Sequence, residues 1–216
     1  MTIFSIINST AVLPTQIMEN ATITIEDGVI IDIAENGAAT ERYVNAEGAI
    51  CMPGIIDSHS DGFEMEPRPR PSVRLPLDFS IQSFEAKVRA AGVTTLFHGI
   101  GFENDGNRTV ESANAYVDII HEYSSSPTVM MNHRVLYRLD ARDADGFNAL
   151  CARIESDRQV DAKPLVSFED HTPGQGQYRD RTYLENWIMG SRNMTREEAV
   201  AHVDQILIER EAVRHN

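Results

Sequence analysis

The feature that most constrains the fold is a regular alternation of apolar runs and amphipathic helical patterns after residue 54. The apolar runs are rich in Val, Ile, Leu and Phe, which is typical of strands buried on both faces. They lie at residues 55–58, 93–98, 129–139 and 164–168. Helical patterns follow at residues 80–91, 110–122, 144–154, 182–189 and 195–214. This strand–helix order predicts parallel strands with right-handed crossovers, and therefore an α/β fold.

Residues 1–52 show a different pattern. Short runs rich in Ile, Val and Thr are separated by Asp27-Gly28 and Asn36-Gly37, and such dipeptides favour tight hairpins. We therefore expect a small antiparallel β-sheet region over residues 1–52. The α/β part should follow over residues 53–216, with about five strands.

The composition limits the classes of partner. The 216 residues include 19 Lys and Arg against 33 Asp and Glu, which gives a formal net charge of −14. This charge disfavours nucleic acid and anionic membranes as partners. The sequence has no apolar run near the ~20 residues of a membrane span and no signal-peptide pattern, so we expect a cytoplasmic protein. Two cysteines are too few for a disulfide framework.

In parallel α/β folds, ligands bind at the carboxyl ends of the strands. The first strand is followed by His59-Ser60-Asp61. Positions i and i+2 of an extended segment point the same way, so His59 and Asp61 can hold one cation. An imidazole with a carboxylate suits zinc, manganese or iron. The alternative is a surface loop without a ligand.

The last predicted strand is followed by the segment EDHTPGQ at residues 169–175. This segment is either a second ligand cluster or a Pro-Gly turn with a capping Asp. The strand before it begins near Arg134 and ends near Asp140. Its charged residues either form a solvated edge or face the site.

Arginines gather just after the first candidate ligands. Arg68, Arg70 and Arg74 lie in or near the segment EPRPRP, whose prolines favour an extended, polyproline-like rod. Planar guanidinium groups match the geometry of phosphate oxygens. The segment is therefore either a phosphate clamp or a rigid linker with solvated arginines.

These motifs together resemble the amidohydrolase superfamily. The segments MPGIIDSHSD and AAGVTTLFHG resemble the opening of its barrel. The segments PGIIDSHSDGFEMEPRPRP, HRVLYRLDARD and EDHTPGQGQY resemble its PhnM-type diphosphatases of the carbon–phosphorus lyase pathway. The resemblance implies an incomplete (β/α) TIM-type barrel preceded by a small N-terminal β-sheet region. It also implies hydrolysis of ribose 1-methylphosphonate 5-triphosphate to the 5-phosphate and pyrophosphate.

The resemblance further implies a divalent metal, Zn or Mn, as one or two ions. His59, Asp61 and His171 would be metal ligands. A carbamylated lysine often bridges the metals in this superfamily, but neither lysine of the chain is expected at a strand's carboxyl end, so the expected bridging ligand is Asp140. A phosphorylated ribose would be bound by Arg68, Arg70, Arg134 and Gln175.

A (β/α) barrel takes ~250 residues, more than the chain has after Met52. By the resemblance, a strand-six His and a catalytic Asp on strand eight would lie beyond residue 216. We therefore expect a fragment, a truncated chain or half of a split protein, which forms a homo-oligomer or needs a C-terminal half. Two alternatives remain: an amidohydrolase that cleaves C–N bonds, and a non-catalytic, partner-binding half-barrel.

Overall fold

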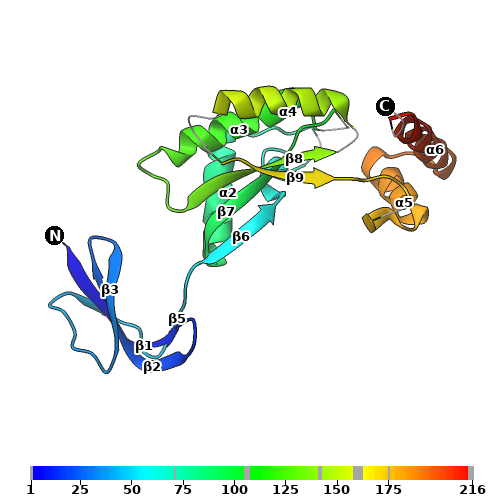
Figure 1. The fold of residues 1–216 in the computed structure, drawn as a ribbon. Helices are drawn as coiled ribbons and strands as arrows, with labels where there is room; N and C mark the ends of the chain where they lie inside the picture. Colours follow the sequence, from blue (N-terminus) through cyan, green and yellow to red (C-terminus); the bar gives the residue numbers. More distant parts are fainter. Residues whose placement is uncertain are drawn as a thin grey trace. The chain divides into compact units, whose positions relative to one another are not determined.

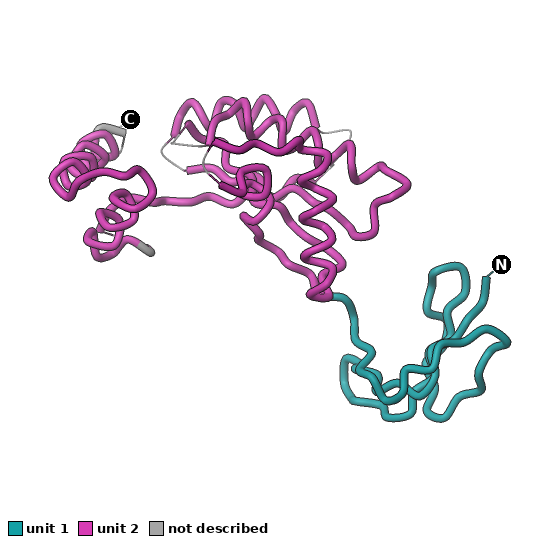
Figure 2. Tube along the Cα trace, turned by 180° about the vertical axis from the view of Figure 1, so that it is seen from behind, with its two compact units in different colours: residues 1–54 teal, residues 55–216 magenta. Residues whose placement is uncertain are grey.

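The computed structural model describes residues 2–70, 72–104, 108–140, 143–157, 163–174 and 176–213. The chain divides into two compact units, Met1–Gly54 and Ile55–Asn216, which are coloured separately in Figure 2.

The first unit is a five-stranded mixed sheet. Its strands are β1 (Ile3–Val12), β2 (Ile17–Glu26), β3 (Val29–Glu35), β4 (Tyr43–Asn45) and β5 (Ile50–Cys51). The first three strands pair antiparallel, with the turn at Asp27 and Gly28 in positive φ, as a two-residue hairpin turn requires. The expectation of a purely antiparallel sheet is wrong, because β4 and β5 pair parallel to β1.

The second unit contains a curled parallel sheet (Figure 1). Its strands are β6 (Ile55–Ser60), β7 (Val93–Gly101), β8 (Asn132–Asp140) and β9 (Leu165–Glu169), and they pair in chain order. The described residues thus give this sheet four strands, where the sequence suggested about five. Parallel strands in sequential order, joined through helices, are the arrangement of a (β/α) barrel.

The connections after the strands contain the helices of this unit. The helices are α1 (Gly62–Met65), α2 (Leu77–Ala90), α3 (Val110–Ser124), α4 (Ala144–Asp157), α5 (Arg181–Arg192) and α6 (Arg196–Val213), with a 3₁₀ turn, η1 (Gly176–Tyr178). α2 packs on β7, α3 on β7 and β8, and α4 on β8. Among the described residues, no helix is long and apolar enough to cross a lipid bilayer.

The core of the second unit lies between the sheet and helices α1 to α4. Its fully buried side chains include Phe63, Ile81, Leu96, Ile100, Phe102, Val117, Ile120 and Tyr137. Burial of this apolar surface fixes the strands in register. Polar residues at the carboxyl ends of the strands are consequently held at one edge of the sheet. Helices α5 and α6 share a separate small cluster of Leu184, Ile188, Ala199 and Val203.

Candidate active site

A cavity of about 790 Å³ opens at the carboxyl ends of the parallel strands. This is the edge at which α/β folds bind ligands. Its lining includes polar side chains from the ends of β6, β8 and β9 and from the segment after β7: His59, Asp61, Glu103, Arg108, Arg138, Asp140, Glu169 and His171.

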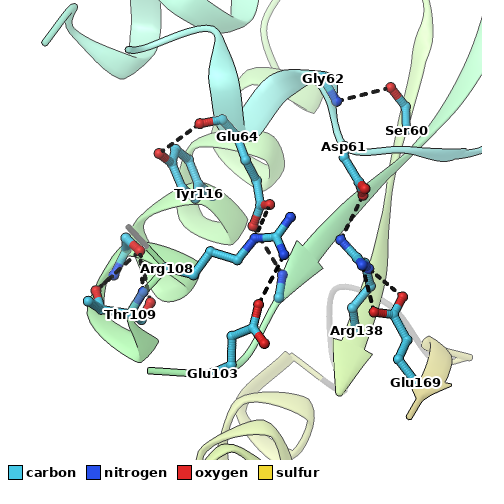
Figure 3. A network of polar contacts seen from close by, with 12 residues as sticks. Ser60, Asp61, Gly62, Glu64, Glu103, Arg108, Thr109, Tyr116, Arg138 and Glu169 are labelled. Carbon is cyan, nitrogen blue, oxygen red and sulfur yellow. Dashed lines mark hydrogen bonds and ion pairs between the residues drawn. The ribbon is translucent and has the colours of Figure 1, made fainter. Parts of the chain in front are cut away.

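Arg138 of β8 is the central side chain of this group. Its Nε and Nη2 donate to the two carboxylate oxygens of Glu169, each at 2.6 Å, and its Nη1 donates to Oδ1 of Asp61 at 2.8 Å (Figure 3). The Arg138 side chain is only 8% exposed. One guanidinium therefore joins a carboxylate at the end of β9 to one just after β6.

Each of these carboxylates also has an imidazole beside it. Nε2 of His59 lies 3.3 Å from Oδ1 of Asp61, and Nε2 of His171 lies 3.5 Å from Oε2 of Glu169. His59, Asp61 and His171, which the sequence singled out, thus lie at the same end of the sheet. Their joint ligation of a metal stays a prediction.

Gly99 of β7 forms the floor under this group. A Cβ at this position would lie 2.7 Å from Oδ1 of Asp61, 2.9 Å from Cδ of Arg138 and 3.2 Å from Cδ2 of His59. Real Cβ atoms essentially never come within 3.0 Å of another atom, so a side chain at residue 99 would force Asp61 and Arg138 to shift and would crowd His59.

The contact between Arg138 and Glu169 favours the charged form of both side chains. Burial alone would raise the pKa of Glu169, but the hydrogen bonds and charge of Arg138 hold that pKa below its usual value. Burial also opposes the charge of Arg138, and the bonds from Glu169 and the charge of Asp61 raise its pKa nevertheless. The site therefore holds a buried, charged guanidinium against an ionised Glu169.

A second guanidinium, that of Arg108, faces the same cavity. Its Nε donates to Oε2 of Glu64 at 2.8 Å, and its Nη1 donates to Oε1 of Glu103 at 3.0 Å (Figure 3). The backbone N–H of Gly101 donates to the other oxygen of Glu64 at 3.1 Å. Burial raises the pKa of Glu64 above its ordinary value, although Arg108 lowers it.

The sequence did not single out Glu64 or Arg108 as site residues. Arg138 and Glu169 were among the charged residues at strand ends that could face the site, but neither was chosen as an expected ligand. Glu64, Arg138 and Glu169 lie inside the motifs that carry the family resemblance. The available signal for Glu169 was its place directly after a predicted strand. The signal for Arg138 was its place near the end of the preceding predicted strand, and strand register pairs it with Gly101 of β7 and Ser167 of β9.

Asp140 lines the cavity, as expected, but its carboxylate is paired with the guanidinium of Arg210 from α6 through two hydrogen bonds. Glu169 lies beside it in register on β9. Glu169 contacts Arg138 and lies 3.5 Å from His171, one of the predicted ligands.

The structure does not bring the predicted phosphate-binding arginines to this cavity. Arg134 is exposed in the first half of β8, six residues before Asp140, which is roughly 20 Å along a strand. Arg68 lines a different pocket, with Glu66 and Lys87. Turn bonds run from the Arg68 N–H to the Met65 carbonyl at 3.0 Å and from the Val73 N–H to the Arg70 carbonyl at 3.2 Å, so the segment with Arg68 and Arg70 is no extended rod. Gln175 lies outside the described residues.

The donor set around Arg138 fits a divalent metal by its chemistry. Two imidazoles and two carboxylates are ligands that Zn²⁺ and Mn²⁺ accept. Among the described residues, no group of three or more His, Cys, Asp or Glu side chains is arranged to hold a metal ion as it stands. The Arg138 guanidinium already lies between Asp61 and Glu169 as a cation, which shows that this position favours positive charge.

Comparison with known proteins agrees with this geometry. No protein-family model matches the chain. The chain is 26% identical over 192 residues to alpha-D-ribose 1-methylphosphonate 5-triphosphate diphosphatase from Escherichia coli (strain K12). The match covers 88% of this chain and 50% of that protein, so the chain spans about half the length of this curated relative. The resemblance predicted from the motifs is confirmed.

Solved structures identify the fold. A triazine hydrolase variant matches with a TM-score of 0.56 and 14% identity, over 77% of this chain and 45% of its own. N-acetylglucosamine-6-phosphate deacetylase from Pasteurella multocida matches with a TM-score of 0.52 and 10% identity, over 87% of this chain and 48% of its own. The predicted fold class, part of a (β/α) barrel after a small β-sheet region, is confirmed.

Proposed function

We propose that this chain provides the metal site of a hydrolase that converts ribose 1-methylphosphonate 5-triphosphate to the 5-phosphate and pyrophosphate. The observation that carries the proposal is the 26% identity to a diphosphatase of that name along 88% of the chain. The fold alone does not choose a substrate, so cleavage of a C–N bond has no comparable support. The proposal places the protein in phosphonate metabolism in the cytoplasm.

His59, Asp61, Glu169 and His171 would hold the metal. Asp140, the bridging ligand expected from the sequence, is paired with Arg210, so Glu169 takes that place in the proposal. A bound divalent metal supplies a water of lowered pKa and shields the charge of the phosphate groups.

The chain's own guanidinium groups would bind the triphosphate. Arg108 faces the cavity and is held in place by Glu64 and Glu103. A planar guanidinium can donate two parallel hydrogen bonds to one phosphate group, which fixes its orientation. Arg108 thus replaces Arg68, Arg70 and Arg134 as the candidate phosphate-binding residue.

The test is pyrophosphate release from ribose 1-methylphosphonate 5-triphosphate by the purified chain with added Mn²⁺ or Zn²⁺. Asp61→Asn should lower the rate by on the order of 100-fold, because metal chemistry supplies several kcal/mol of the rate enhancement. The matched control is Asp118→Asn, which makes the same chemical change on an exposed carboxylate of α3. A measurable rate of the unaltered chain that both variants retain equally would contradict the assignment of the site.

A further inference from the structure

The position of Arg138 raises a conflict with metal binding. Three of its N–H groups donate to Asp61 and Glu169. These are two of the four side chains that would hold the metal. Both oxygens of Glu169 and Oδ1 of Asp61 already accept from Arg138, so a metal ion bound there would share these oxygens with the guanidinium.

We propose that the Arg138 guanidinium competes with the divalent cation for Asp61 and Glu169, so that metal loading displaces Arg138 from both carboxylates. Arg138 would thus be a positioning residue that holds the ligands before the metal binds. This inference rests on the proposed function, because it needs the metal site.

Charge is the first reason why the two cations exclude each other. A guanidinium and a divalent ion between the same carboxylates would be like charges at close range in a partly buried site, where repulsion is weakly screened. Without either cation, only the neighbouring imidazoles of His59 and His171 would face the carboxylates, and Glu169 is largely buried, with a side chain 16% exposed. We therefore expect Asp61 and Glu169 to bind either the Arg138 guanidinium or the metal ion, but not both at once.

Space is the second reason. Gly99 leaves open the floor over which Asp61 and Arg138 meet, and the cavity of about 790 Å³ lies beside them. The long Arg138 side chain can therefore turn away from the carboxylates without leaving the cavity. The lining of this cavity offers other carboxylates, such as Glu103 and Asp143, with which the displaced guanidinium could pair.

The alternative is that Arg138 is a permanent strut that orients the ligands. The two roles predict opposite changes. If Arg138 competes with the metal, Arg138→Gln should bind metal more tightly. If Arg138 is a strut, the same variant should bind metal more weakly, because its carboxylates lose their orientation.

The experiment is isothermal titration of the full chain with Mn²⁺, without substrate. Arg138→Gln should tighten Mn²⁺ binding by about tenfold or more, since it removes both a competitor and a like charge. The matched control is Arg108→Gln, which removes the same charge from the same cavity but breaks no bond to Asp61 or Glu169. It should change the affinity by less than about threefold.

Affinity in Arg138→Gln equal to or weaker than that of the unaltered chain would overturn the inference. Circular dichroism checks folding, and if Arg138→Gln does not fold, Arg138→Lys decides by the same criterion, because a lysine cannot bridge both carboxylates as a planar fork. Failure of Mn²⁺ to bind any of these chains would overturn the inference and the metal site together. Tight binding that Arg138→Gln leaves unchanged would overturn this inference alone, and the pyrophosphate assay would still test the proposed function.

Discussion

At the residue scale, Gly99 gives the sharpest prediction, because three side chains of the candidate site lie over it. Gly99→Ala should lower the free energy of unfolding by about 1–3 kcal/mol, as overpacking does elsewhere, and should displace Asp61 from Arg138. The control is Gly190→Ala in α5, where a Cβ meets nothing within 4 Å. That change should stabilise the chain by about 0.5–1 kcal/mol. Urea denaturation measures the change in the free energy of unfolding for each variant. Changes of the same sign in the two variants would contradict the prediction.

Residue-level reasoning from the sequence succeeded where local position determines what a side chain can reach. The spacing of His59 and Asp61 predicted that they lie together, and the structure places Nε2 of His59 3.3 Å from Oδ1 of Asp61; their joint binding of a cation stays a prediction. The arginines were harder, because 17 of them occur in the chain and spacing does not show which ones face a cavity. Prolines around Arg68 and Arg70 suggested a rod, but backbone hydrogen bonds fold that segment into turns. The place of Arg138 near a strand end allowed it to face the site, but its bonds to Asp61 and Glu169 are visible only in the structure.

At the element scale, a buried polar chain links two helices and two strands. Nε2 of His98 on β7 lies 2.8 Å from Nδ1 of His133 on β8, and Nε2 of His133 lies 3.0 Å from Oε2 of Glu85 on α2. Tyr123 of α3 donates to the other oxygen of Glu85 at 3.2 Å. With Glu85 ionised, the simplest proton arrangement has both imidazoles neutral, each donating from Nε2.

The buried His98–His133–Glu85 hydrogen bonds should make the free energy of unfolding depend on pH. Burial, and then the neighbouring His133, lower the pKa of His98 to about 3. In the unfolded chain the pKa would be about 6.5, so the unfolded state binds more protons between these values. The free energy of unfolding should therefore fall as the pH is lowered from about 6.5 towards about 3, by at most ~1.4 kcal/mol per pH unit from His98. The lowered pKa of His133 adds a change of the same sign.

Urea denaturation at pH 7, 6 and 5 measures this slope. His98→Phe places an uncharged ring between Phe63 and Phe84, which His98 contacts, and should make the slope shallower. The control is His202→Phe on α6, since that histidine is not part of the buried chain. A slope that His98→Phe leaves unchanged would show that His98 is protonated equally in both states.

Strands could be predicted from the sequence where they are long enough to show a clear apolar pattern. Each of β6 to β9 includes most of a predicted apolar run, because strands buried in a parallel sheet need continuous apolar sequence. The pairing partners of β4 and β5 were missed, because segments of three and two residues carry no period. Their parallel pairing depends on where the chain returns to β1, which only the folded sheet shows.

At the scale of the whole molecule, the parallel sheet has two open edges. Within the described residues, β6 pairs only with β7 and β9 pairs only with β8. Apolar side chains are exposed on both edge strands, notably Ile56 at 66% and Phe168 at 69%. Edges with unpaired N–H and C=O groups and exposed apolar side chains promote association. The sequence allowed this expectation from a strand count, but which side chains are exposed is visible only in the structure.

We therefore expect the purified 216-residue chain to self-associate, or to bind a further segment that pairs with these edges. Phe168→Lys should reduce self-association, because a charge on an edge strand disfavours strand pairing with another molecule. Tyr183→Lys is the matched control, since it adds the same charge at an equally exposed aromatic residue on α5, away from the sheet edges. Light scattering after size-exclusion chromatography at two concentrations measures the mass. If the unaltered chain is a monomer at both concentrations, the edges are protected in solution and this prediction is wrong. If both lysine variants lower the mass equally, added charge rather than the edge of β9 controls association.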